Sequence, residues 1–106
     1  MIEPTIDYGE ELTRVVDFLR SMPLAKLSRP VDDGPTRAEL ARDVAQKLAD
    51  ACAGAEGRPV RAVPDVGEGA VGDQIAVTGA DLLRAGPNDE VLAEAAGHLR
   101  TLRLAL

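Results

Sequence analysis

The chain has 106 residues and a formal net charge of −6, and 45% of its residues are hydrophobic. This length suits one domain whose core needs no disulfide or metal to hold it together. An acidic chain lacks the basic footprint that binding to nucleic-acid phosphates requires. Aromatic residues make up only 2% of the chain, so we expect a core of Leu, Val, Ile and Ala, which favours packed helices over a sheet.

The sequence shows no sign of a disulfide, a signal peptide or a membrane span, and these features bear on its cellular compartment. Its one cysteine, Cys52, can form no disulfide within the chain, which favours a reducing environment. The N-terminus carries Glu3, Asp7, Glu10 and Glu11 and does not resemble a signal peptide. No apolar stretch approaches the roughly 20 residues of a membrane span. We therefore expect a cytoplasmic protein with no membrane partner.

The first predicted helix covers residues 7–21. Asp7 followed by Glu10 is a capping-box pattern, with an acid at the N-cap and a Glu three residues later. Pro23 should end the helix, because the residue before a proline avoids the helical region. The apolar positions recur every three or four residues, as expected for one buried helix face: Leu12, Val15, Val16, Leu19 and Met22.

The connector 23–35 is rich in proline and contains an Asp-Asp-Gly turn signal. Leu24 and Leu27 are expected to reach the core from it, and a short helical turn is compatible with this segment. The second predicted helix, 37–53, follows the capping box Thr36-Arg-Ala-Glu39. Gly54 is its expected C-terminal stop.

A third helix is predicted over residues 70–85. It follows a Gly- and Pro-rich segment, 55–69, in which residues 60–63 form at most a brief extended piece. Gly79 inside this helix costs about 1 kcal/mol relative to Ala. Because Gly79 lies on the apolar face, it can offset that cost by letting a neighbouring helix come close. Gly86 and Pro87 should end the helix.

The fourth predicted helix covers residues 89–104 and is capped by Asn88. Its apolar residues follow a spacing of three and four, typical of a coiled-coil seam: Leu92, Ala95, Leu99, Leu102 and Leu106. Two hypotheses remain for these residues: they fill the core, or some of them remain exposed and form an interface. Four helices with short or moderate connections predict an all-α fold, a small antiparallel bundle forming a single domain over residues 1–106.

Residues 67–72 contain Gly67, Gly69 and Gly72 in the G-x-G-x-x-G spacing of the dinucleotide-binding fingerprint. That fingerprint requires a strand before it and a parallel strand after the helix, and neither is predicted here. Glu68 and Asp73 also place negative charge where phosphates would lie. We therefore interpret the glycines as a turn into the third helix, with Asp65 or Glu68 capping or charging its start.

The run VPDVGEGAVGDQIAVTGADLL, residues 63–83, resembles a segment of small uncharacterised helical proteins from GC-rich bacteria. It covers about a fifth of the chain, and the composition, with much Ala and Arg and little Lys, is also typical of GC-rich genomes. The resemblance implies no activity and assigns no functional residue.

Catalytic residue types are scarce. The only histidine, His98, has no second His or Cys nearby in sequence, so neither zinc nor any other metal site is predicted. A nucleophile and base would have to be Cys52 and His98, yet Cys52 continues the apolar row of the second helix and reads as a buried, inert thiol. We predict no catalytic residue and no cofactor.

Charge is uneven along the chain. The last residues carry Arg100 and Arg103 without an acid, whereas residues 1–17 carry five acids. Both arrangements suit helix dipoles and solvated faces. Alternatively, the basic tail docks on an acidic patch of the chain itself or of a second copy.

These patterns favour a non-enzymatic protein-interaction or assembly module. It would self-associate or bind a partner protein through the third helix and the leucines of the fourth, Leu92, Leu99, Leu102 and Leu106. The alternative is a small-ligand binder or enzyme that uses the Gly-rich turn with Asp65, Glu68, Asp73 and Gln74. A nucleic-acid partner held by Arg100 and Arg103 is the weakest hypothesis, because two arginines neutralise few phosphates.

Overall fold

The computed structural model describes residues 7–106, and this part of the chain is all-α, as predicted. Residues 1–6, which include Glu3 and the start of the predicted 1–106 domain, lie outside the described residues. The helices are α1 (Tyr8–Ser21), α2 (Leu24–Leu27), α3 (Arg37–Glu56), the 3-10 turn η1 (Glu68–Ala70), α4 (Val71–Arg84) and α5 (Asp89–Ala105).

Three predicted helix starts, those of α1, α3 and α5, are confirmed by their hydrogen bonds. The Asp7 carboxylate accepts a hydrogen bond from the backbone N–H three residues on, at 2.9 Å. Thr36 and Glu39 form both halves of a capping box at the start of α3. The Asn88 side chain accepts from the N–H of Val91 at 2.9 Å. Each bond satisfies an N–H that the first helical turn leaves without a partner.

The predicted end of α3 is wrong. The helix continues through Gly54 to Glu56, and Gly57 closes it in the left-handed conformation, with φ of 67°. The N–H of Arg58 then donates to the carbonyl of Ala53 at 2.8 Å, which satisfies one of the last helical carbonyls. A glycine inside an exposed helix costs only about 1 kcal/mol, so Gly54 alone does not stop α3.

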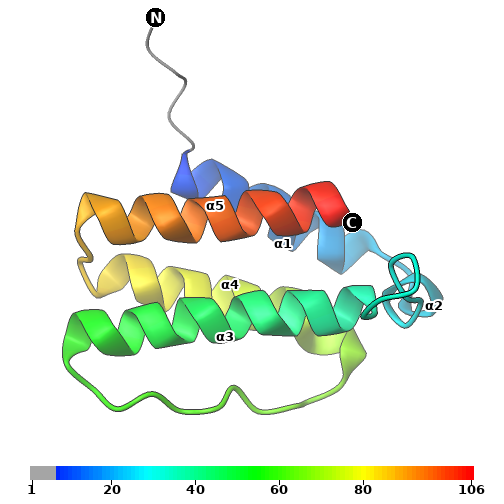
Figure 1. Cartoon of the computed structure of the whole chain (residues 1–106), viewed down its shortest axis with the longest axis horizontal. Coiled ribbons are helices and arrows are strands. Elements are labelled where there is room, and N and C mark those ends of the chain that lie inside the picture. Colours follow the sequence, from blue (N-terminus) through cyan, green and yellow to red (C-terminus); the bar gives the residue numbers. More distant parts are fainter. Residues whose placement is uncertain (1–6) are drawn as a thin grey trace, which may run out of the picture.

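The connector between α1 and α3 contains one helical turn, α2. Leu27 is buried there, as predicted, but Leu24 is exposed, so its predicted place in the core is wrong. Figure 1 shows α2 at one end of the bundle.

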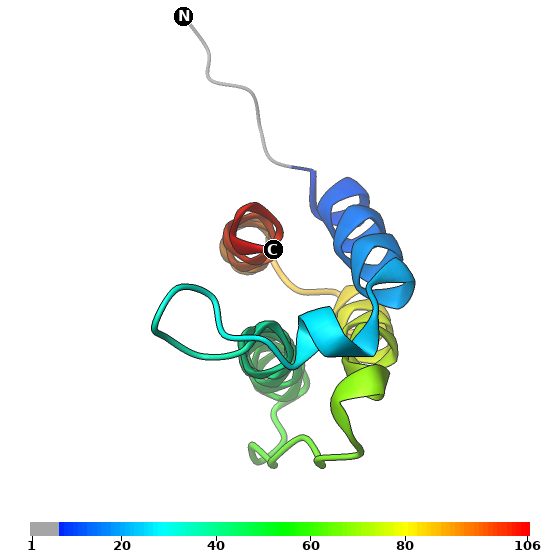
Figure 2. The same cartoon turned by 90° about the vertical axis from the view of Figure 1, so that its right-hand side faces the viewer.

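The four long helices do not all run antiparallel to their neighbours. Seen end-on, α1, α4, α3 and α5 surround the core in that order (Figure 2). α1 runs antiparallel to α4, and α5 runs antiparallel to α3, but α3 and α4 are parallel (Figure 1). The parallel pair exists because residues 57–67 travel back along the bundle before α4 begins. α1 and α5, which also contact each other, are parallel as well (Figure 1). The antiparallel expectation therefore fails for two neighbouring pairs, α3 with α4 and α1 with α5.

The core has the predicted aliphatic composition. Six large side chains are fully buried: Leu48, Ile75, Leu82, Leu99, Val15 and Val71. Alanines of α3 and α5 fill the spaces between them, and of the two aromatic residues only Tyr8 is buried.

The α1–α4 seam, the contact between α1 and α4, is closed by a glycine. A Cβ placed on Gly79 would lie 2.5 Å from Cδ1 of Leu12, so any larger residue would require this leucine side chain to shift. The Tyr8 hydroxyl donates to the carbonyl of Gly79 at 2.7 Å, and burial raises the pKa of Tyr8 to about 12. The predicted close approach at Gly79 is therefore confirmed.

Candidate functional site

The four residues of the predicted ligand site do not gather around one point. Each is taken up by a different partner: Asp65 by Arg42 at 3.0 Å, Glu68 by Ser28 at 3.0 Å, Asp73 by Arg20 at 2.8 Å, and Gln74 by the carbonyl of Pro64 at 2.6 Å. Only Asp73 and Gln74 line a common cleft. The contacts of Asp65, Glu68 and Gln74 hold the segment before α4 to other parts of the chain, and the contact of Asp73 joins α4 to α1.

The glycine turn lacks the features of a phosphate-binding loop. Gly67 adopts a positive φ of 101° and leads into η1 without a preceding strand in the described residues. Neither Asp65 nor Glu68 caps α4, whose N-cap makes no side-chain hydrogen bond. Asp73 lies in the first turn of α4, where an anion would approach. Gly67 and Gly69 thus belong to the turn, in line with the interpretation from sequence, whereas Gly72 lies inside α4 and packs against Leu19 of α1. The predicted capping of this helix by Asp65 or Glu68 is wrong.

The crossover between α3 and α4, which we call the strap (residues 57–67), is held down by helix side chains. Gln46 accepts from the N–H of Val63 at 2.7 Å and donates to the carbonyl of Arg61 at 2.9 Å, so its amide replaces a neighbouring strand. Gln74 and the Arg42–Asp65 ion pair fix the following residues. The strap is therefore an ordered extended segment without a sheet.

Between the strap and α4 lies a cleft of about 450 Å³, the strap cleft. Its walls are almost entirely apolar, and they include Val63, Pro64 and Val66 of the strap and Val77 of α4. Val66 and Val77 are 61% and 59% exposed, so neither is covered by the rest of the chain. Arg61, Asp73, Gln74 and Thr78 supply the polar groups at its edge.

Two buried polar atoms beside the strap have no hydrogen-bond partner among the described residues. They are Nε of Arg42 and Oε1 of Gln74, on the side chains that hold the strap. Buried polar atoms are nearly always paired in folded proteins. Both side chains nevertheless bind the strap through their other polar atoms, Arg42 at the carboxylate of Asp65 and Gln74 at the carbonyl of Pro64.

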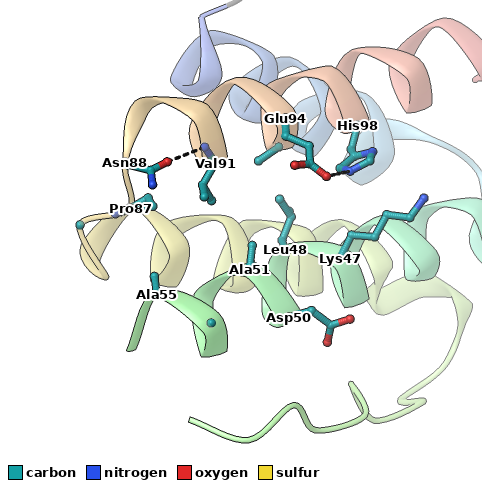
Figure 3. Close-up of a pocket in the computed structure, with 13 residues that line it drawn as sticks. Lys47, Leu48, Asp50, Ala51, Ala55, Pro87, Asn88, Val91, Glu94 and His98 are labelled. Atoms are coloured by element: carbon teal, nitrogen blue, oxygen red, sulfur yellow. Dashed lines mark hydrogen bonds and ion pairs between the residues drawn. The ribbon is translucent and has the colours of Figure 1, made fainter. Parts of the chain in front are cut away.

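A larger cleft, of about 780 Å³, lies between α3 and α5, and we call it the α3–α5 cleft. Figure 3 shows Leu48 and Ala51 of α3 pointing toward Val91 of α5 across it. His98 and Glu94 form its edge on α5, with 3.6 Å between Nε2 and Oε1. Its other edge carries Lys47, which pairs with Asp43 on α3 at 3.1 Å.

The predicted interface leucines divide into two groups. Leu99 and Leu102 are buried inside this chain, which takes them out of the surface that a partner can reach. Leu92 and Leu106 pack against the core from its edge and stay half-buried. Because α5 turns the middle of its leucine row inward, the surface it offers beside α3 is formed by other residues, chiefly Val91.

The sequence does not predict which groups the C-terminal arginines contact, and the structure shows the contact of one of them, Arg103. Arg103 binds both carboxylate oxygens of Glu11, at 2.7 and 3.1 Å, although Glu11 is largely buried. The guanidinium of Arg103 holds the pKa of Glu11 below its ordinary value of 4.5. The tail thus docks on an acid of its own chain, and Arg103 is not free for a nucleic-acid phosphate.

Cys52 and His98 do not form a catalytic pair. Cys52 lies behind the strap, where its thiol contacts Glu56 at 3.1 Å, whereas His98 lines the α3–α5 cleft. Burial, reinforced by the hydrogen bond to Glu56, raises the pKa of the Cys52 thiol. A buried, protonated thiol is a poor nucleophile, as the apolar spacing of α3 predicts.

Comparison with known protein families, with curated proteins and with solved structures finds no match to this chain. Within residues 7–106, no group of three or more acidic, His or Cys side chains is arranged to hold a metal ion. The same residues include no helix whose length and apolar character would let it cross a membrane. The two clefts are the features of the described surface that have room for a ligand or a partner.

Proposed function

We propose that this protein is a non-enzymatic interaction module of the cytoplasm that binds an amphipathic helix of a partner protein in the α3–α5 cleft. The observation that carries the proposal is that cleft itself. It is an opening of about 780 Å³ along two of the four long helices, with the half-buried Ala51 of α3 facing Val91 of α5 across it and the fully buried Leu48 at its base.

The shape of the cleft favours a helix as its occupant. Its two walls are antiparallel helices, so the opening runs along their common direction (Figure 1). Ala51, Gly54 and Ala55 on α3 and Ala95 on α5 are small, so large apolar side chains from an incoming helix would find space between them. An apolar helix face laid into such a groove is a recurrent mode of peptide recognition.

The charge of the chain favours a basic partner over a second copy. The net charge is −6, and two copies would repel each other over their whole surfaces. At the edge of the cleft, Asp43 offsets the charge of Lys47, and Glu94 adds another negative charge. A partner helix with Lys or Arg beside its apolar face would complement this edge.

Site-specific photo-crosslinking in cells of the source organism tests the proposal. A photoreactive phenylalanine derivative replaces Ala51, which lines the cleft, or Ala93, an exposed alanine of α5 outside it. We expect position 51 to crosslink one partner through a basic amphipathic segment, identified by mass spectrometry of the joined peptides, and position 93 to give no such product.

Other products would contradict the proposal. A crosslink between two copies of this chain at position 51 would replace the foreign partner by self-association. Equal products at positions 51 and 93, or none at either, would remove the α3–α5 cleft as the binding surface. A small molecule that is reproducibly bound in the α3–α5 cleft would replace the partner helix by a ligand, at a place other than the Gly-rich turn of the alternative hypothesis.

A further inference from the structure

We propose that the strap cleft binds an aliphatic carboxylate, with its hydrocarbon chain between the strap and α4 and its carboxylate at Arg61. This site is separate from the α3–α5 cleft and does not depend on a protein partner.

The strap is a long connection, and connecting α3 to α4 does not by itself require it to hold one fixed conformation. Connections between packed helices usually take about two to eight residues, and longer ones without secondary structure are often functional. Here the crossover must return along the bundle, but it does so in a fixed extended form. Gln46, Gln74 and Arg42 hold its backbone or its Asp65 side chain. A wall fixed before binding loses little conformational entropy when a ligand arrives.

The walls point to a hydrocarbon ligand. Val63 and Val66 on the strap and Val77 on α4 surround a space of about 450 Å³, within the range of small-molecule sites. A hydrophobic face normally packs inward, yet Val66 and Val77 leave more than half of their surfaces exposed. Covering them with an aliphatic chain removes this apolar surface from water, which favours binding.

The charges at the edge indicate an anionic head group. Four polar side chains reach the cleft, and two of them are charged, Arg61 and Asp73. The carboxylate of Asp73 is paired with Arg20 at 2.8 Å. No carboxylate in the described part of the chain lies within ion-pair distance of Arg61. The positive charge at Arg61 is thus available to a carboxylate, which a guanidinium binds through two parallel hydrogen bonds.

Titration with octanoate, monitored by the methyl NMR signals of the valines, tests this inference at neutral pH and below micelle-forming concentrations. We expect saturable shifts at Val63, Val66 and Val77, and weaker binding of neutral octanol and of octylammonium. Arg61→Gln should weaken octanoate binding about tenfold, as for loss of one charge-assisted contact, and leave octanol binding unchanged. Arg100→Gln, at an exposed arginine away from the cleft, should change neither.

A second pair of variants tests the apolar wall. Val77→Asp should abolish binding of octanoate, whereas Val60→Asp, at an equally exposed valine of the strap that does not line the cleft, should leave it intact. Both valines are exposed, so neither change threatens the fold. The inference is overturned if octanoate shifts the signal of no valine of the cleft, or if octanol binds as tightly as octanoate. It is also overturned if Val77→Asp and Val60→Asp have the same effect on octanoate binding.

Discussion

The seam between α1 and α4 and the seam between α3 and α5 both contain small residues, but one is closed and the other is open. Gly79 on α4 faces Leu12 so closely that an added Cβ would lie 2.5 Å from its Cδ1. Gly54 on α3 lines the α3–α5 cleft, and a Cβ there would meet nothing within 4 Å. A small residue therefore marks close packing only where a large side chain stands opposite it.

The difference depends on what each helix places across the seam. On α1, Leu12 packs against Gly79 and Leu19 packs against Gly72, and Tyr8 donates its hydrogen bond to the carbonyl of Gly79. α5 turns Leu99 and Leu102 into the core and offers α3 chiefly Val91 and Ala95. The closed seam thus serves stability, and the open seam is the surface on which a partner has room to bind.

The largest expected effect comes from removing a core leucine of α5. Leu99→Ala should lower the free energy of unfolding by about 3 kcal/mol, because Leu99 is fully buried and its removal leaves a cavity. Leu92→Ala, at the half-buried edge of the same helix, should cost about 1 kcal/mol. Chemical denaturation followed by circular dichroism measures both. Equal costs would mean that α5 does not turn Leu99 inward, and the contrast between the seams would fail.

Filling the closed seam should have the next largest effect. Gly79→Val should lower the free energy of unfolding by about 2 kcal/mol, since its side chain would displace Leu12 from a packed position. Gly97→Val on α5 is the matched control, because a Cβ at Gly97 meets nothing within 4 Å. Its effect should stay below about 0.5 kcal/mol. If Gly79→Val left the free energy of unfolding unchanged, the α1–α4 seam would be as loosely packed as the α3–α5 seam.

The ion pair between α1 and α5 gives a smaller effect that depends on pH. Arg103→Gln should lower the free energy of unfolding by about 1.5 kcal/mol at pH 7, a value kept modest because Arg103 is partly exposed. Folding lowers the pKa of Glu11 below 4.5, so the pair stabilises the protein above that pH. As the pH falls below 4.5 and Glu11 becomes protonated, the difference between variant and parent should shrink.

Denaturation at a series of pH values measures this difference directly. Arg29→Gln is the control, since Arg29 is exposed, does not act on the pKa of Glu11 and should cost almost nothing at any pH. A cost at Arg103 that stays constant down to pH 3 would show that the residue stabilises the bundle by packing and not by its charge.

Local features of this fold could be predicted from the sequence, because they depend on residues close together in the chain. Thr36 with Glu39 and Asn88 with Val91 cap their helices through contacts over three residues. The direction of α4 could not be predicted this way. Hydrophobic periodicity defines a helix face but not the direction of the helix, and the length of the strap was the only sign of a crossover.

The candidate sites were harder to predict because their contacts join distant residues. Asp73 and Asp65 are close in sequence, but their partners, Arg20 and Arg42, come from two other helices. The spacing of leucines on α5 defined a face without showing which part of it points inward. The α3–α5 cleft arises from the small residues of both walls, and nothing in the sequence of either helix alone reveals that they face each other.

The smallest predicted effect has the opposite sign, and it is the sharpest test of the open seam. Gly54→Ala should raise the free energy of unfolding by about 0.8 kcal/mol, because alanine is the better helix former and its Cβ meets nothing. Gly57→Ala, three residues away, should lower it by about 1 kcal/mol, because Gly57 has a φ of 67° that alanine adopts only with strain.

Since these two glycines sit at the same end of α3, one denaturation experiment compares them under identical conditions. If Gly54→Ala instead destabilises the isolated protein, position 54 is already covered and the α3–α5 cleft is closed in solution. If it stabilises the protein and also weakens crosslinking at position 51, the missing Cβ at Gly54 is kept for the partner and not for the fold. In that case the same change at Gly54 raises stability and lowers binding. This opposition is expected if the α3–α5 seam stays open for a partner.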